Sequence, residues 1–536
     1  MSVQADDASQ EREAAGRPGA KAASAQGLLA ALAALAVLYA SLGNFVTYHD
    51  YPLLRPEVAW VAGGLMLLAF AVGAIYWVGG HLLRALLEAT LVFLAVDLNS
   101  GVAWPAVLAG GAIFLLCYLR RVSVLRFVAI IAAVALLATL LGVQERRPSL
   151  ARLAGQSAAP RSGGPAIVHI ILDEHAGLGG LRDPQARREL SQFYVSRGFR
   201  LFSRAYSHHF HTVNAIPEIL NFGAGGNSEA SREHLRTGRT AYLGLLARRG
   251  YAINVYESDF ADFCSDVAFA SCTRYWSPSI AFLEGLPLST REKAWLIAFK
   301  FAGLSNLAIR LTRTYNGLVA VFGPERKGPP RIWLERWGLS STLSGLAAFD
   351  ALTADLRRAR RGNVYFAHLL VPHYPYVAEA DCAILPPSQW EYRRSVTPLA
   401  GREEAYARQL RCAMAKLDGA LRALAQSPAG DDAIVIVHGD HGSRIVASEP
   451  RSDRVGRFSE DDLVAGFSTL FVVRGPGIPT GIEPAPAAAS DLLASLARSD
   501  FRNVEPPRRP LPRSVLLDDR DWIPRRRVPL PAEWQQ

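Results

Sequence analysis

Apolar residues along this chain form five long runs near its start and shorter runs further on. The long runs cover residues 27–47, 57–79, 82–98, 103–119 and 124–143. Most approach the roughly 20 residues that a helix needs to cross the hydrocarbon core of a membrane, and the third and fourth are the shortest. We therefore predict a five-helix transmembrane domain at 27–143. The small, polar residues 1–26 before it are expected to form a disordered cytoplasmic tail.

Beyond residue 165 the pattern changes to short strand-like runs that alternate with helical periodicity. The strand candidates are 166–172, 199–206, 252–257, 363–370, 433–438 and 468–473. The helix candidates are 183–196, 239–249, 342–360, 402–426 and 489–498. This alternation predicts an α/β domain at 166–504, with a mostly parallel sheet flanked by helices.

Three segments interrupt this organisation. Residues 144–165 are rich in Arg, Ser, Gly and Pro and are expected to be a linker, whereas 505–536 is Pro- and Arg-rich and is expected to be an extended strap. Residues 290–322 are moderately apolar and basic. Either a helix at the membrane surface or packing against the catalytic domain would explain that segment.

Charge gives an orientation for the predicted helices. The net charge of +10 is carried mainly by scattered Arg residues, which suit anionic lipid head groups, and no nucleic-acid-binding motif is found. Arg120, Arg121 and Arg126 lie in or beside the loop after the fourth run, whereas 98–102 contains no Lys or Arg. The positive-inside rule then places the amino terminus inside the cell and everything after residue 143 outside.

The cysteines agree with this placement. Of five cysteines, Cys117 lies alone in a predicted span, and Cys264, Cys272, Cys382 and Cys412 lie in the domain assigned to an oxidising compartment. Four such cysteines suggest two disulfides. Three connectivities are open; proximity in sequence favours Cys264 with Cys272 and Cys382 with Cys412, and four unpaired thiols are the alternative.

Two apolar runs end abruptly in acidic and imidazole groups. They are IVHIILDEH at 167–175 and IVIVHGDHG at 434–442. Buried parallel strands have this composition, and chemistry collects at their carboxyl ends. Asp173, Glu174, Asp440 and His441 are therefore predicted to converge, and carboxylates with one imidazole suit a divalent metal.

Between these strands, SHHFHTVNAIPEIL at 207–220 leads into a helical pattern. Pro217 favours a first helical turn, which places Thr212 near a helix amino terminus where negative charge is stabilised. A hydroxyl bound to a metal there would lose its proton more readily and could attack phosphorus. Alternatively, Thr212 only caps the helix.

Two further polar clusters are ambiguous. His208, His209 and His211 either bind a second metal or lie in a solvated turn. The acids around Cys264 are expected to form a solvated loop. They are Glu257, Asp259, Asp262 and Asp266.

The order of these motifs resembles the sulfatase and alkaline phosphatase superfamily over about residues 166–500. The matching elements are the strand ending in Asp and Glu, Thr before AIPEIL, HLLVPHYPY, GDHG and LFVVRGPGI at 470–478. Five spans before an external domain further resemble the branch that contains lipoteichoic acid synthases, phosphoethanolamine transferases and phosphoglycerol transferases. The resemblance implies an extracytoplasmic alkaline-phosphatase-like fold.

The resemblance also assigns roles to individual residues. It makes Asp440 and His441 metal ligands and Thr212 the metal-bound nucleophile. It places Asp173 and Glu174 at the first strand end, and which of them is the main ligand stays open. Zn²⁺ is the expected metal, and Mn²⁺ accepts the same ligands.

Three further residues are candidates on the substrate side. His373 matches the histidine that contacts phosphate oxygens or protonates a leaving group. His368 is either a second such group or a core histidine, and Arg444 either contacts phosphate or forms a surface ion pair. Sulfatases carry Cys or Ser where Thr212 stands, so sulfate-ester hydrolysis is disfavoured.

These observations predict a multi-pass enzyme of the bacterial cytoplasmic (inner) membrane with its catalytic domain on the periplasmic side. It would transfer phosphoethanolamine or phosphoglycerol from a membrane phospholipid to an envelope glycan or lipid, through a phospho-threonine. Two alternatives remain: a phosphodiesterase or other hydrolase of the same superfamily, and a catalytically inactive membrane scaffold. The oligomeric state is not predicted.

Overall fold

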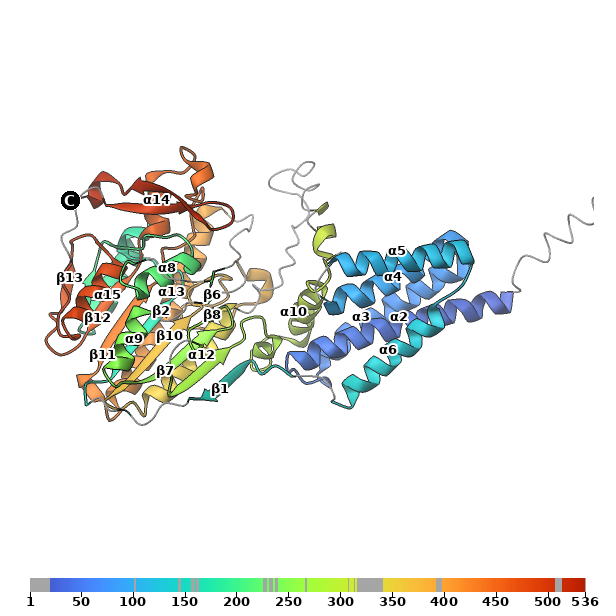
Figure 1. Cartoon of the computed structure of the whole chain (residues 1–536), viewed down its shortest axis with the longest axis horizontal. Coiled ribbons are helices and arrows are strands. Elements are labelled where there is room, and N and C mark those ends of the chain that lie inside the picture. Colours follow the sequence, from blue (N-terminus) through green and yellow to red (C-terminus); the bar gives the residue numbers. More distant parts are fainter. Residues whose placement is uncertain are drawn as a thin grey trace, which may run out of the picture. The chain divides into compact units, whose positions relative to one another are not determined.

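The computed structural model divides the chain into two compact units (Figure 1). The first comprises Met1–Arg147 with Leu283–Arg336, and the second comprises Pro148–Phe282 with Trp337–Gln536. The structure describes the chain except for residues 1–19, 101–102, 143–145, 156–159, 161–162, 225–228, 231–234, 237–239, 266–267, 307, 313, 316–340, 392–397, 507–512 and 536.

The first unit is helical. Its long helices are α2 (Ala20–Tyr48), α3 (Pro56–Val78), α4 (His81–Ser100), α5 (Ala103–Arg120), α6 (Leu125–Leu140) and α10 (Thr290–Ala302). Helix α2 packs against α3 and α6, and α4 packs against α5. Helices therefore lie at all five positions where apolar runs predicted them.

Two of these helices meet the requirements for a membrane span. Ser24–Tyr48 and Pro56–Val78 are long and apolar enough, whereas Trp104–Arg120 and Leu125–Leu140 are apolar but shorter. Helix α4 carries Glu88 and Asp97, which lowers its mean hydropathy. The predicted tail is partly wrong, because α2 already begins at Ala20; residues 1–19 lie outside the described part.

The basic segment that interrupts the α/β pattern belongs to the helical unit. Its helix α10 packs against α3. Asp97 of α4 is fully buried and accepts hydrogen bonds from Ser305 Oγ at 2.7 Å and Asn306 Nδ2 at 2.9 Å. A buried carboxylate needs such donors, so Asp97 holds the inserted segment on the helices. The part of the prediction beyond residue 315 lies outside the described residues.

The second unit is built on a nine-stranded sheet. Its strands, in spatial order, are β1 (Leu150–Ala154), β9 (Ser271–Tyr275), β7 (Ala252–Ser258), β10 (Asn363–Leu369), β2 (Ile167–Leu172), β11 (Ile434–Gly439), β12 (Phe471–Arg474), β3 (Arg200–Phe202) and β13 (Gly481–Glu483). The five strands from β9 to β11 are mutually parallel, whereas β1 and β12 run antiparallel to their neighbours. The predicted mostly parallel sheet is therefore present.

Helices cover both faces of this sheet (Figure 1). They are α7 (Pro184–Val195), α8 (Thr212–Leu220), α9 (Ala241–Arg248), α12 (Ser341–Leu356), α13 (Leu399–Ala425) and α15 (Ala489–Arg498). Because side chains alternate along a strand, Val168, Ile170 and Leu172 of β2 enter one core with α7, α12 and α13. Ile167 and Ile171 enter the other core, with α8, α9 and α15.

Two segments predicted to lack regular structure contain strands. Residues 150–154, in the expected linker, form the edge strand β1, which pairs with β9. The expected carboxyl-terminal strap is instead an antiparallel hairpin of β15 (Ser514–Asp518) and β16 (Pro524–Pro529). Val515 and Leu517 of this hairpin pack in a small core with α14 (Glu460–Phe467).

The remaining strands form small sheets. They are β4 (Ala205–Tyr206) with β14 (Ala487–Ala488), and β5 (Glu229–Ala230) with β6 (Leu235–Arg236) and β8 (Ala261–Asp262).

Both disulfides favoured by the sequence are present. Cys264 pairs with Cys272 and Cys382 pairs with Cys412. Cys117 is a buried free thiol. The second disulfide joins the loop that follows β10 to helix α13.

Candidate metal centre

The acidic residues at the two strand ends meet in space. Strands β2 and β11 are adjacent and parallel, with Leu172 opposite Gly439. Asp173 and Asp440 therefore leave the same edge of the sheet side by side. A Cβ on Gly439 would lie 2.4 Å from the carbonyl oxygen of His175, so only glycine allows this close approach of the two strand ends.

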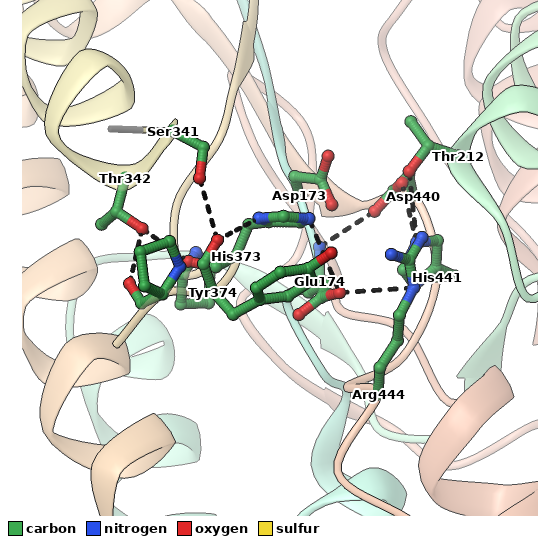
Figure 2. A network of polar contacts seen from close by, with 12 residues as sticks. Asp173, Glu174, Thr212, Ser341, Thr342, His373, Tyr374, Asp440, His441 and Arg444 are labelled. Carbon is green, nitrogen blue, oxygen red and sulfur yellow. Dashed lines mark hydrogen bonds and ion pairs between the residues drawn. The ribbon is translucent and has the colours of Figure 1, made fainter. Parts of the chain in front are cut away.

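Figure 2 shows the cluster that results. Asp173, Asp440 and His441 each offer a ligand atom, and these atoms all lie within 4.8 Å of one another. A second group of this kind consists of Asp173, Glu174 and His373. Asp173 belongs to both groups, whereas Glu174 belongs to the second only.

Thr212 is the first residue of α8, as the sequence predicted for a residue near a helix amino terminus. Its Oγ1 lies 3.3 Å from Nε2 of His441 (Figure 2). Thr212 is buried, and His211 before it provides no side-chain cap for the helix. The expectation that Pro217 occupies the first turn is wrong, because Pro217 lies inside the helix.

The hydrogen bonds of His441 fix which ring nitrogen faces the cluster. Its Nδ1 lies 2.8 Å from the carbonyl oxygen of Gly442 and donates to it. Nε2 then carries the lone pair, and Arg444 Nη2 donates to it from 3.0 Å. This tautomer leaves the Nε2 lone pair facing the cluster, and a metal bound there would take the place of the Arg444 hydrogen bond.

Arg444 is a buried cation rather than a surface residue. Its Nε lies 3.3 Å from Oε1 of Glu174, which is fully buried (Figure 2). Burial opposes the charge of Arg444, yet Glu174 and the neighbouring aspartates raise the pKa of the guanidinium above its usual value. The surface ion pair considered from the sequence is therefore wrong.

Glu174 itself has a constrained backbone. Its φ of +63° lies in the left-handed region, which costs a non-glycine residue about 1 kcal/mol or more. The surrounding hydrogen bonds enforce it: the Glu174 amide donates to Asp440 Oδ1 at 3.1 Å, and its carbonyl accepts from the Tyr406 hydroxyl at 2.9 Å. This geometry turns the Glu174 carboxylate toward Arg444.

The two histidines that the sequence analysis considered for the substrate side have different surroundings. His373 is partly exposed, and its Nε2 lies 3.8 Å from Glu174 Oε1. His368 is fully buried in β10, with Nε2 3.4 Å from Asp173 Oδ2. Burial opposes ionisation of Asp173, but these histidines and His441 outweigh it and hold the pKa of that carboxyl below its usual value. His368 therefore contacts Asp173, a candidate metal ligand, from a fully buried position.

The loop that carries His373 is held by polar side chains of α12 and α13. Thr342 Oγ1 lies 2.7 Å from the carbonyl oxygens of both His373 and Pro375, and its single proton can be donated to either. Gln409 Nε2 donates to the carbonyl of His373 at 2.8 Å. Ser341 Oγ donates to the carbonyl of Tyr374 at 2.9 Å. The sequence analysis did not identify these supporting residues.

The cluster fits a divalent cation. Asp173 Oδ1, Asp440 Oδ2 and both carboxylate oxygens of Glu174 are buried, and none accepts a hydrogen bond from the described residues. Buried carboxylate oxygens without donors are costly unless a cation lies beside them. Zn²⁺ takes carboxylate oxygen and imidazole nitrogen in a tetrahedral set, and Asp173, Asp440 and His441 supply such atoms, with the Thr212 hydroxyl beside His441.

The histidines at 208–211 and Glu257, one of the acids near Cys264, are not solvated. His209 and His211 are buried, and His208 is nearly so, which contradicts a solvated turn. Glu257 is fully buried and accepts from Arg274 Nε at 2.7 Å and from the Phe263 amide at 2.6 Å. A solvated loop is therefore wrong for Glu257; Asp266 lies outside the described residues.

Asp518 is a further residue near the site that the sequence analysis missed. It ends β15 and is fully buried beside His211. SVLLDD at 514–519 was a usable signal, because it is an apolar run that ends in acids, like the two main strands.

Comparison with known proteins yields structural neighbours only. No family model and no curated protein matches the chain. The C-terminal periplasmic domain of EcEptC from Escherichia coli, in complex with Zn, is 9% identical, with a TM-score of 0.39 over 73% of this chain and 98% of that chain. A putative sulfatase from Bacteroides thetaiotaomicron is 14% identical, with a TM-score of 0.39 over 67% of this chain and 78% of that chain. A phosphonate monoester hydrolase of Agrobacterium radiobacter is 14% identical, with a TM-score of 0.36 over 62% of this chain and 73% of that chain.

Proposed function

We propose that this protein is a metal-dependent phosphotransferase of the cell envelope that uses Thr212 as its nucleophile. One observation carries the proposal: the Thr212 hydroxyl lies 3.3 Å from His441, within a cluster of carboxylates whose buried oxygens lack donors among the described residues. A threonine that served only as a helix cap would need no such cluster.

A bound Zn²⁺ or Mn²⁺ would lower the pKa of the Thr212 hydroxyl and neutralise charge on phosphoryl oxygens. Asp173, Asp440 and His441 would hold the metal. The Thr212 oxygen attacks phosphorus, the bond from phosphorus to the leaving oxygen breaks, and the threonine proton passes to solvent. His373 donates a proton to the leaving oxygen, because it is the partly exposed imidazole of the cluster.

Arg444 would bind the phosphoryl group that Thr212 receives. Its guanidinium is buried, faces Glu174 and His441, and can offer paired N–H donors to phosphate oxygens. Acceptor attack on phosphorus then breaks the phosphorus–Thr212 bond and returns the free hydroxyl.

The proposed donor is a membrane phospholipid, and diacylglycerol is the leaving group when its phospho-head-group is transferred. The proposed acceptor is an envelope glycan or lipid. Two helices are long and apolar enough to span a membrane, and large side chains of α3, α5 and α6 are exposed, including Leu67, Leu108 and Phe127. Such a surface suits lipid rather than water. Anchoring in the bilayer raises the effective concentration of a lipid donor. We place the catalytic unit on the periplasmic side, where its disulfides would persist.

The test uses the full-length, zinc-loaded protein with vesicles of phosphatidylethanolamine and phosphatidylglycerol. We expect diacylglycerol release and a Thr212 peptide whose mass rises by one phospho-head-group. Thr212→Ala should abolish both, and Thr212→Ser, which keeps a hydroxyl, should retain part of the activity. Release of free head-group phosphate without any modified acceptor would identify a hydrolase, and full activity of Thr212→Ala would refute the proposal.

A further inference from the structure

The carboxyl-terminal hairpin reaches the segment that carries Thr212. The amide of Leu516 donates to the carbonyl of His208 at 2.8 Å. Asp518 Oδ2 accepts from His211 Nδ1 at 2.7 Å and from Asn214 Nδ2 at 3.2 Å. His211 and Asn214 lie on either side of Thr212 in the sequence, so the Asp518 carboxylate binds the chain both before and after the proposed nucleophile.

The turn of the hairpin makes a second set of contacts with the same segment. The ring of Trp522 stacks on His211, with centroids 4.8 Å apart and planes inclined by 21°. The carbonyl of Trp522 accepts from Asn214 Nδ2 at 2.8 Å. Asp518 and Trp522 therefore enclose His211 and Asn214 from one element that is more than 300 positions away in the sequence.

Asp518 is buried in its ionised form, which makes its contacts with the histidines before Thr212 costly to break. Its side chain is inaccessible to solvent. Burial opposes the ionised form, but His209 and His211 outweigh it, so the pKa of Asp518 lies below its usual value. A buried ionised carboxylate is strongly bound to its donors, because losing them would leave an unpaired charge.

The neighbourhood of Thr212 depends on where the His211 side chain points. His211 occupies the cap position of α8, yet its side chain provides no cap and is directed to Asp518 instead. The backbone of Thr212 is therefore set by a contact outside its own helix. A displacement of about 1 Å at a reacting atom can lower a rate by about 100-fold.

We propose that Asp518, supported by Trp522, is a positioning residue that fixes the Thr212 hydroxyl at the metal cluster. This inference rests on the proposed function for its catalytic consequence, and on the contacts above for its structural part. The Asp518 side chain contacts His211 and Asn214 and is not one of the grouped metal-ligand candidates. Asp518 would therefore act on Thr212 through the residues on either side of it.

The experiment compares Asp518→Asn and Asp518→Ala with Asp521→Asn, an exposed acid in the same hairpin. The full-length, zinc-loaded proteins are assayed with bis(4-nitrophenyl) phosphate, and zinc content and melting temperature are measured on each. We expect kcat to fall about 100-fold in Asp518→Ala and less in Asp518→Asn, which keeps an acceptor oxygen. KM and zinc content should stay within about twofold, and Asp521→Asn should match the wild type.

Hydrogen exchange of the amides in 208–214 provides a readout that does not need activity. In Asp518→Ala these amides should exchange at least about tenfold faster, while exchange in strands β2 and β11 is unchanged. A folded Asp518→Ala protein with wild-type kcat, or with wild-type exchange in 208–214, would overturn the inference. If Asp518→Ala does not fold, kcat and hydrogen exchange in 208–214 are measured on Asp518→Asn instead, and wild-type values there would overturn the inference. A wild type without Thr212-dependent turnover would instead overturn the proposed function, and exchange alone would then decide whether Asp518 fixes the segment.

Discussion

Removing a divalent cation from the proposed metal centre is expected to destabilise the second unit, which carries that centre. Asp173, Glu174 and Asp440 are almost completely buried within one cluster, and Arg444 is the buried guanidinium beside them. Without a metal the carboxylates repel one another in a medium of low dielectric constant, and with a metal their charges are largely neutralised. The cation therefore binds the folded state far better than the unfolded chain.

The size of the effect follows from linkage. Free metal at about 100 times its dissociation constant adds about 2.7 kcal/mol to the free energy of unfolding. The second unit comprises Pro148–Phe282 and Trp337–Gln536. With an unfolding entropy of about 2.1 cal/mol/K per residue over the 335 residues of this unit, this corresponds to a rise in melting temperature of about 4 °C.

The assay is a thermal melt of the detergent-solubilised full-length protein, with excess Zn²⁺ or with a chelator. Asp440→Asn is the matched control, because it removes a ligand charge and keeps the shape. We expect this variant to lose the zinc-dependent shift while melting no lower than wild type in chelator, since one repelling charge is gone. Equal melting temperatures of the wild type in zinc and in chelator would refute a metal role for the cluster.

Two further predictions concern stability. Replacing Cys382 and Cys412 with Ser opens a loop of 30 residues, so the free energy of unfolding in denaturant should fall by about 3–4 kcal/mol; an unchanged midpoint would contradict this. Burial lowers the pKa of His169 well below its usual value and that of His438 to about 4. Below about pH 6.5 the unfolded chain binds these protons and the folded protein does not, so stability should drop by up to about 1.4 kcal/mol per pH unit for each histidine down to about pH 4. Unfolding curves between pH 7 and 4 test this, and His169→Gln should flatten the slope.

The parts that the sequence predicted are those governed by local pattern. The strand ends at Asp173 and Asp440 could be placed because buried parallel strands are continuous apolar runs, and neighbouring parallel strands end at one edge. Thr212 was predicted near a helix start, which is correct, but the signal used for it was wrong, because Pro217 lies inside α8 rather than in its first turn. The pairing of Cys264 with Cys272 followed from their short separation.

The parts that the sequence missed depend on distant partners. Strand β1 is an exposed edge strand without an apolar alternation, so only its pairing with β9 defines it. Glu257 resembled a solvated acid until Arg274 and the Phe263 amide were placed around it. Asp518 meets His211 across 307 positions, and no local pattern encodes such a contact.

The chain leaves the second unit after Phe282 and returns to it at Trp337. A soluble fragment that simply starts at residue 148 would therefore carry α10 without its partner α3, together with Ser305 and Asn306 without Asp97. Such a fragment would expose the apolar side of α10, including Ile297 and Phe301, and would tend to aggregate. Replacing residues 283–336 with a flexible linker between Phe282 and Trp337 should give a better-behaved protein for crystallisation.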